Sequence, residues 1–309
     1  MNRKTKSLPR VFLAGVVLVV LAYLIACAAM EKGVSVLTSP EKLSQKDKAS
    51  LLRVAKALRS SFADITEEEE YYIGRSVAAT ILATYPALNN SRLTRYVNRV
   101  GQAVVLYSDR PEIFAGYHFL VLDSNEINAM AAPGGFIFIT KGLLRLCRNE
   151  DMLAAVLAHE VGHVAAKHGL RSIKKSRLIE AFRLLASEAA QRSGSAELAK
   201  LVSTYESILG DITATLIERG YDRKFETEAD ELAVKFMTRA GYSPTALSDF
   251  LAALVSSAQA SSGKGWFKTH PAPEKRLAKV SAKIKALPQV PAVAKVRTQR
   301  FHQYCSRLK

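Results

Sequence analysis

Residues 159–163 read His159-Glu160-Val161-Gly162-His163, an H-E-x-x-H pattern inside a run that must be helical. The run extends from residue 152 to residue 166 and is apolar nearly all round, as expected of a helix buried in a core. Because positions i and i+4 share one helix face, the two histidines can point their imidazoles at one metal ion. Glu160 is offset by about 100° from His159, so it lies beside the metal, where a general base for a zinc-bound water belongs.

The third ligand distinguishes the classes of zinc peptidase. A metzincin would need the longer pattern H-E-x-x-H-x-x-G-x-x-H, but the chain has Ala166 and Gly169 at its last two defined positions. His168 lies about 140° round the helix from His163, so we expect it at the helix end, near the negative C-terminal dipole, and outside the metal site. The third ligand must therefore come from another segment.

A second helix offers a glutamate for this position. Residues 225–230 read Phe225-Glu226-Thr227-Glu228-Ala229-Asp230, so Glu226 and Asp230 share one helix face while Glu228 points away. A carboxylate ligand, with an aspartate that accepts the N–H of a ligating imidazole, is typical of zinc sites. A solvated acidic helix face would explain the same residues. Next to an incomplete H-E-x-x-H site, we interpret Glu226 as the third ligand and Asp230 as the supporting aspartate.

Further landmarks accompany these two helices along the chain. They are residues 128–140 (NAMAAPGGFIFIT), residues 142–144 (GLL), residues 149–151 (NED), and His270-Pro271 followed by Arg276. On these residues the chain resembles the HtpX- and BepA-like zinc metallopeptidases, gluzincins of metallopeptidase family forty-eight, which also contains the CAAX prenyl endopeptidases. The resemblance runs from about Thr66 to Leu287. It implies one zinc ion (Zn2+) per chain, with the ligands His159, His163 and Glu226, the base Glu160 and the supporting Asp230.

The resemblance also draws attention to His270. Residues 261–265 just before it are glycines, serines and a lysine, which predicts a mobile loop, and Pro271 holds the residue before it extended. In the resembling family a histidine here lies near the metal, where it can occupy the open coordination position or donate to the oxyanion. A surface-loop histidine that caps a helix over residues 271–285 is the alternative.

The predicted fold class is α+β, a mainly helical gluzincin zinc-peptidase domain with a small sheet. Besides the H-E-x-x-H helix, the pattern predicts helices over residues 68–84, 91–107 and 222–240 and strands over residues 116–123, 126–132 and 135–140. The resemblance implies an edge strand that lines the active-site cleft and pairs with extended substrate backbone. We assign this role to Gly135, Phe136, Ile137 and Phe138, with an interior strand of the core sheet as the alternative.

The N-terminus predicts export and lipidation. Four basic residues precede an unbroken apolar run from residue 11 to residue 26, the pattern of a signal peptide. The run ends in Leu24-Ile25-Ala26-Cys27, which resembles a bacterial lipobox, so we expect cleavage before Cys27 and acylation there. Ala28 after the cysteine favours the outer over the inner membrane. An uncleaved membrane helix is the alternative, because the apolar stretch continues to Met30 and about 20 residues can span a bilayer.

We therefore expect four segments: a lipoprotein signal peptide (1–26), a tether with a short helix (27–65), the zinc metallopeptidase domain (66–288) and a basic tail (289–309). The chain carries a net charge of +16, and loss of residues 1–26 would remove four positive charges and no negative ones. No nucleic-acid motif accompanies this charge, so we predict no nucleic-acid partner. A basic surface near anionic lipid headgroups explains it better.

Two cysteines remain once Cys27 is acylated. Cys147 and Cys305 form an even pair in a compartment that we expect to be oxidising, so a disulfide between them would pin the tail to the catalytic half. Two buried or unpaired thiols are the alternative.

Together these features predict a zinc-dependent endopeptidase, lipid-anchored in the bacterial envelope and facing the periplasm. Its substrates would be unfolded or misassembled envelope proteins with extended segments, cleaved in quality control or maturation. An assembly factor or chaperone with latent proteolysis is a different class of function. The intact residues of the predicted site argue against a dead enzyme, but they do not exclude a latent one.

Overall fold

The computed structural model describes residues 65–172, 210, 212–257, 265–270, 272–306 and 308. All of them belong to one of the two units into which the chain divides, the unit of residues 65–175 and 206–309. The predicted signal peptide and Cys27 lie outside the described residues. Within the described part of the chain, no helix is both long and apolar enough to cross a membrane.

Helix α7 (Glu150–Ala165) runs through the centre of the core and carries the H-E-x-x-H residues. It begins where the Asn149 side chain accepts a hydrogen bond from the backbone N–H of Met152 at 2.8 Å, a typical N-cap. Helix α11 (Arg223–Arg239) packs along α7. Gly162 allows this close approach, because a Cβ atom there would lie 3.1 Å from the carbonyl oxygen of Ala229.

A small sheet covers another side of α7 and has three strands in the order β1-β3-β2. The central strand β3 (Phe136–Thr140) is parallel to β1 (His118–Leu122) and antiparallel to β2 (Ala129–Ala132). The sequence prediction of an α+β fold, mainly helical with a small sheet, is confirmed.

The assignment of the edge strand to Gly135, Phe136, Ile137 and Phe138 is wrong. Gly135 ends the short 3-10 helix η2 (Pro133–Gly135), and the other three residues lie on β3, which has a partner strand on both sides. The run is apolar at nearly every position because an interior strand is buried on both faces. The edge strand that packs against α7 is β2.

The remaining helices surround this core. They are α4 (Glu67–Thr84), α5 (Ser91–Val105), α6 (Lys141–Leu146), α8 (His168–Arg171), the π-helix η3 (Thr215–Arg219), α12 (Thr245–Val255), α13 (Trp266–Thr269), α14 (Pro273–Lys285) and α15 (Lys295–Cys305). The helices that the sequence predicted over residues 68–84, 91–107 and 222–240 are confirmed to within two residues at each end.

Helix α15 lies in the segment that was expected to form a basic tail. Its Phe301 and Cys305 are buried, and it packs against α5 and α7. Cys147 is also buried, and both cysteines are free thiols in this structure, which agrees with the alternative of two buried thiols rather than with a bridge.

Candidate metal centre

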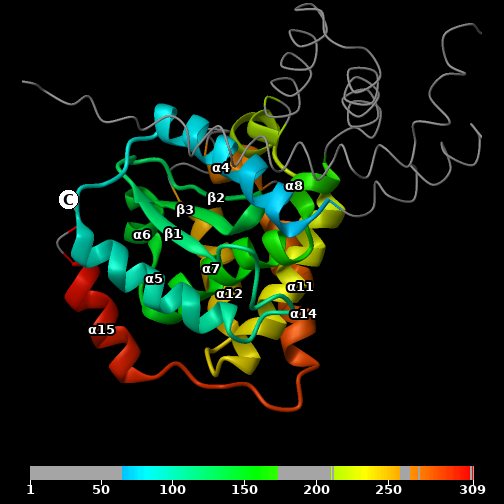
Figure 1. Ribbon diagram of the computed structural model, residues 1–309. Coiled ribbons are helices and arrows are strands. Elements are labelled where there is room, and N and C mark those ends of the chain that lie inside the picture. The colour runs from blue at the N-terminus through cyan, green and yellow to red at the C-terminus, as the bar shows by residue number, and fades with distance from the viewer. Residues whose placement is uncertain are drawn as a thin grey trace, which may run out of the picture. The chain divides into compact units, whose positions relative to one another are not determined.

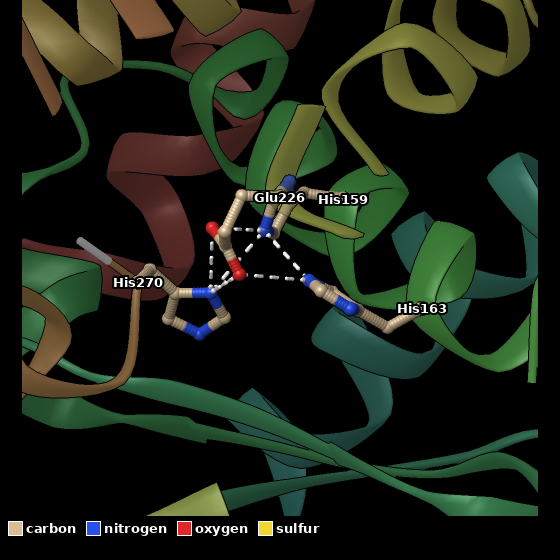
Figure 2. A group of neighbouring side chains, drawn as sticks. All are labelled: His159, His163, Glu226 and His270. Carbon is tan, nitrogen blue, oxygen red and sulfur yellow. Dashed lines mark hydrogen bonds and ion pairs between the residues drawn. The ribbon is translucent and has the colours of Figure 1, made fainter. Parts of the chain in front are cut away.

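Four buried side chains converge where α7, α11 and the residue after α13 meet. They are His159 and His163 of α7, Glu226 of α11 and His270. Figure 2 shows the three imidazoles and the carboxylate turned toward one another. One ligand atom from each of the four residues lies within 4.8 Å of the others, and none of the residues is more than 2% exposed. His270 is therefore part of the site, and its interpretation as a surface-loop residue is wrong.

The spacing of these atoms fits a tetrahedral metal ion. Ligand atoms bonded to zinc at about 2.0–2.2 Å in a tetrahedron lie roughly 3.3–3.6 Å apart. His159 Nε2 lies 3.1 Å from His163 Nε2 and 3.3 Å from His270 Nδ1. The Glu226 carboxylate oxygens lie 3.5 Å from His163 Nε2 and 3.6 Å from His159 Nε2. Three imidazole nitrogens and one carboxylate are also a donor set that zinc accepts.

Asp230 lies where the sequence predicted the supporting aspartate. Its Oδ1 atom is 3.0 Å from His159 Nδ1, so it accepts the ring N–H and leaves Nε2 directed into the centre. Arg276 of α14 donates two hydrogen bonds to the same carboxylate, from Nε at 2.8 Å and from Nη2 at 2.7 Å. Its Nη1 lies 2.7 Å from Glu226 Oε2. Burial opposes ionisation of Asp230, but the Arg276 charge outweighs it and lowers the pKa of Asp230 to about 2.

His168 is not among the converging ligand residues, as expected, but it supports the second histidine. Lys167 adopts a left-handed conformation (φ 55°), which ends α7 and restarts the chain as α8. His168 Nδ1 comes within 2.9 Å of His163 Nδ1, and its Nε2 lies 3.1 Å from Glu228 Oε2. If His163 offers Nε2 to a metal, its Nδ1–H donates to His168, which in turn donates to Glu228.

Glu160 lies beside the four converging groups, as the H-E-x-x-H pattern predicts. It is fully buried, and neither carboxylate oxygen has a hydrogen-bond partner among the described residues. His270 Nε2 is 3.7 Å from Glu160 Oε1. Burial raises the pKa of Glu160 to about 7. A buried carboxylate without a partner is costly, and such groups concentrate where a protein needs a proton acceptor near neutral pH.

The edge strand β2 borders the centre and turns backbone groups toward it. The Asn128 carbonyl accepts from Thr140 N on the β3 side, so the alternate residues Ala129 and Ala131 direct their carbonyls away from β3. His270 Nε2 lies 3.3 Å from Ala129 O, and the Tyr221 hydroxyl donates to Ala131 O at 3.4 Å. The free edge of β2 is thus occupied by two side chains.

Tyr221 was not found from the sequence, and no motif marks it. Its ring stacks on the His163 imidazole, with centroids 4.2 Å apart and planes 16° from parallel. Its backbone N–H donates to Thr269 O at 3.1 Å, which links it to the segment that carries His270. The two side chains that occupy the β2 edge are therefore coupled through the backbone.

Comparison with known proteins identifies the family. Residues 90–284 match the family described as Peptidase family M48. The chain belongs to this family. It is 28% identical over 219 residues to the beta-barrel assembly-enhancing protease of Escherichia coli (strain K12), a match that covers 68% of this chain and 42% of that protein. It is also 28% identical over 229 residues to the mitochondrial metalloendopeptidase OMA1 of Schizosaccharomyces pombe, covering 72% and 63% of the two chains.

The beta-barrel assembly-enhancing protease of Yersinia pestis is 26% identical over 227 residues, a match that covers 71% of this chain and 44% of that protein. The chain thus aligns with less than half of the length of these bacterial relatives. The resemblance to metallopeptidase family forty-eight that the sequence predicted is confirmed.

Proposed function

We propose that this protein is a zinc-dependent endopeptidase with one zinc ion per chain, held by His159, His163 and Glu226. The observation that carries the proposal is the convergence of these ligand atoms next to Glu160, a buried carboxylate without a hydrogen-bond partner in the described residues. A zinc ion held there would lower the pKa of the attacking water and would polarise the scissile carbonyl.

The chain's own residues perform the proton transfers and hold the geometry. Glu160 takes the proton from the attacking water and passes it to the leaving amine. Asp230 holds the His159 ring through its Nδ1–H. Arg276 pairs with both the Asp230 and the Glu226 carboxylates and so offsets part of their buried negative charge. His168 holds the His163 ring in the same way on the other side.

The substrate would bind as an added strand along β2. The outward-facing backbone of Ala129 and Ala131 can form hydrogen bonds with an antiparallel or parallel neighbouring strand. Because these bonds join main chain to main chain, they select little for the side chains of the substrate. Such pairing requires an extended segment, which supports unfolded or misassembled proteins as substrates. It replaces the role that the sequence had assigned to residues 135–138.

The structure also favours one of the two roles of His270. Its Nε2 lies 3.3 Å from Ala129 O and its Nδ1 lies 3.0 Å from Glu226 Oε1. In the tautomer whose Nε2–H donates to Ala129 O, the Nδ1 lone pair is available to a metal ion at the centre. In this position His270 would complete a four-ligand set and close the position that a catalytic zinc keeps for water. We therefore propose that His270 inhibits the resting enzyme, and that substrate displaces it together with Tyr221.

A closed site is the observation that favours the second candidate function, an assembly factor or chaperone with latent proteolysis. One set of relatives is named for enhancing beta-barrel assembly. We propose a setting in the bacterial envelope, periplasm-facing and preferably at the outer membrane, with Cys27 as the lipid anchor after removal of residues 1–26. An uncleaved N-terminal anchor is the alternative.

Casein cleavage by the full chain tests the proposal. We expect cleavage by the zinc-loaded protein, loss of cleavage with a chelator and recovery when zinc is restored. Suppression of the aggregation of an unfolded outer-membrane protein is measured in parallel. Cleavage that survives complete zinc removal would contradict the metal mechanism. Suppression of aggregation without any cleavage of casein, even in His270→Ala, would support the second function.

A further inference from the structure

Helices α5 and α15 together carry six basic residues, of which Arg297 pairs with Asp151 and Arg300 with Glu150 at the start of α7. Helix α5 contains Arg92, Arg95 and Arg99, and α15 contains Lys295, Arg297 and Arg300, while neither helix contains an aspartate or a glutamate. The chain has no acidic residue after Glu274. The sequence showed the basic residues as scattered, but the fold brings these two groups together.

The three arginines of α5 lie on its outer face. Their spacing of three and four residues places them on one side of the helix, and all three are exposed. Helix α5 turns its apolar residues inward: Leu93, Tyr96, Val97, Val100 and Val104. In the described part of the chain none of the three arginines has a carboxylate in ion-pair contact, whereas Lys235 and Arg239 elsewhere both pair with Asp109. The positive charge of α5 is thus left for another partner.

Helix α15 is fixed beside α5 by contacts that reach the start of the catalytic helix. The Tyr96 and Tyr304 rings stack with centroids 4.4 Å apart, and the Arg92 guanidinium lies 5.0 Å above the Tyr304 ring. Arg300 binds the fully buried Glu150 carboxylate, with Nε 2.6 Å from Oε2, yet its side chain remains 46% exposed. Figure 1 shows the two helices side by side.

A cavity opens between the two helices. It has a volume of about 280 Å³ and is lined by Arg99, Arg300, the hydroxyl-bearing Tyr96 and Tyr242, and Glu150, among others. One water occupies about 30 Å³ in the liquid, so the cavity has room for a phosphate group with its attached alcohol. The two arginines at its wall carry more positive charge than Glu150 cancels.

Exposed apolar side chains lie next to this basic surface. Val290 and Val293, in the segment that leads from α14 into α15, are 37% and 40% exposed, and Val296 in the first turn of α15 is 61% exposed. Lysines flank the segment at 285 and 295. Apolar side chains beside basic ones suit the headgroup region of a bilayer, where valines enter the acyl boundary and cations meet phosphates. A nucleic acid would give the valines no partner.

We propose that the face formed by α5, α15 and the segment leading into α15 docks on an anionic phospholipid surface. The α5 arginines and Arg300 contact lipid phosphates, and the cavity receives one headgroup. Because α15 is held by Glu150 at the start of α7, this contact would set the orientation of the metal centre to the bilayer. The proposal does not depend on peptidase activity.

Photo-crosslinking of the full chain in vesicles tests this contact. The protein is reconstituted through its own N-terminus into two kinds of vesicle. One contains phosphatidylcholine with a photoactivatable phosphatidylcholine. The other also contains phosphatidylglycerol, with a photoactivatable phosphatidylglycerol. Mass spectrometry then locates the crosslinked peptides. We expect crosslinks in α5 and in residues 286–306 with phosphatidylglycerol, and their loss at high salt because exposed charges are screened.

Two matched variants give the decision. In Arg92→Gln/Arg95→Gln/Arg99→Gln, crosslinking to these segments should fall about fivefold or more, since even one charge near an anionic leaflet contributes about that factor. The control Lys275→Gln/Lys279→Gln/Lys283→Gln removes the same charge from exposed positions of α14 and should leave the crosslinking unchanged. Unchanged unfolding temperatures show that both variants are folded. An equal fall in both variants, or crosslinks confined to residues 1–64, would overturn the proposal.

Discussion

The Nδ1 atoms of His163 and His168 lie 2.9 Å apart, although the two residues belong to different helices. One of the two nitrogens must donate and the other accept. Because the Glu228 carboxylate can only accept, His168 donates to it from Nε2 and, when neutral, accepts at Nδ1. The His163 Nδ1–H then donates to His168, which leaves the His163 Nε2 lone pair available to a metal ion.

His168→Phe should therefore weaken zinc binding without removing a ligand. Loss of a partner that orients a ligating histidine typically costs about 10–100-fold in metal affinity. Zinc affinity is measured by competition with a chelator of known strength. Glu228→Gln keeps His168 in place and should cost less. Equal zinc affinity in His168→Phe and the wild type would show that His168 is a core histidine only.

Glu160→Gln should keep stoichiometric zinc and lose proteolysis, because Glu160 is the base and is not among the converging ligand atoms. Removing a general base costs on the order of 10²–10⁴-fold in rate. Zinc content and casein cleavage are measured on the same preparation, with the exposed Glu112→Gln as the control. A Glu160→Gln protein with a near wild-type rate would refute the mechanism.

Glu226→Ala should lose both zinc and activity, whereas Glu228→Ala should keep most of both. Glu226 faces the three histidines, whereas Glu228 contacts His168 and Arg171 and none of the converging ligand atoms. Glu226→Ala also leaves the buried Arg276 with one carboxylate fewer, so some loss of stability accompanies it. Measurements of zinc per chain after dialysis compare the two variants. Zinc loss from Glu228→Ala alone would overturn the ligand assignment.

His270→Ala should raise the basal rate of proteolysis and keep zinc, because it frees the position that His270 Nδ1 occupies and the Ala129 carbonyl that Nε2 holds. Initial rates on casein measure the effect, with the exposed His302→Ala as the control. Slower turnover with zinc retained would instead mean that His270 stabilises the oxyanion. An unchanged rate would reject both roles.

Cys27→Ser should accumulate as an unprocessed, full-length precursor that takes up no labelled fatty acid. A simple membrane anchor would be indifferent to this change. Incorporation of labelled palmitate into wild type, Cys27→Ser and the control Cys147→Ser provides the comparison. Absence of label from the wild type would decide for the uncleaved helix.

The sequence by itself determined what is local along the chain. The i and i+4 spacing of the histidines, the phase of Glu226 and Asp230, and the offset of Glu160 all follow from helix geometry, and the structure has each of them where the spacing predicts. The family, and with it the mainly helical α+β fold, was also within reach of the sequence, because its landmarks are short contiguous motifs.

Only the tertiary structure decided the relations between segments. Strand order depends on how segments pair in space, so the sequence predicts residues 135–138 as an edge although β3 lies between two strands. A single left-handed residue, Lys167, moved His168 into the site. Tyr221 and His270 contact the β2 edge, and α15 contacts α5, although these segments lie far apart in the sequence. Helix and strand periodicities relate only residues a few positions apart, so they do not predict such contacts. The periodicity of apolar residues indicates which face of a helix or strand is buried. Which elements pack against that face is decided only by the tertiary structure.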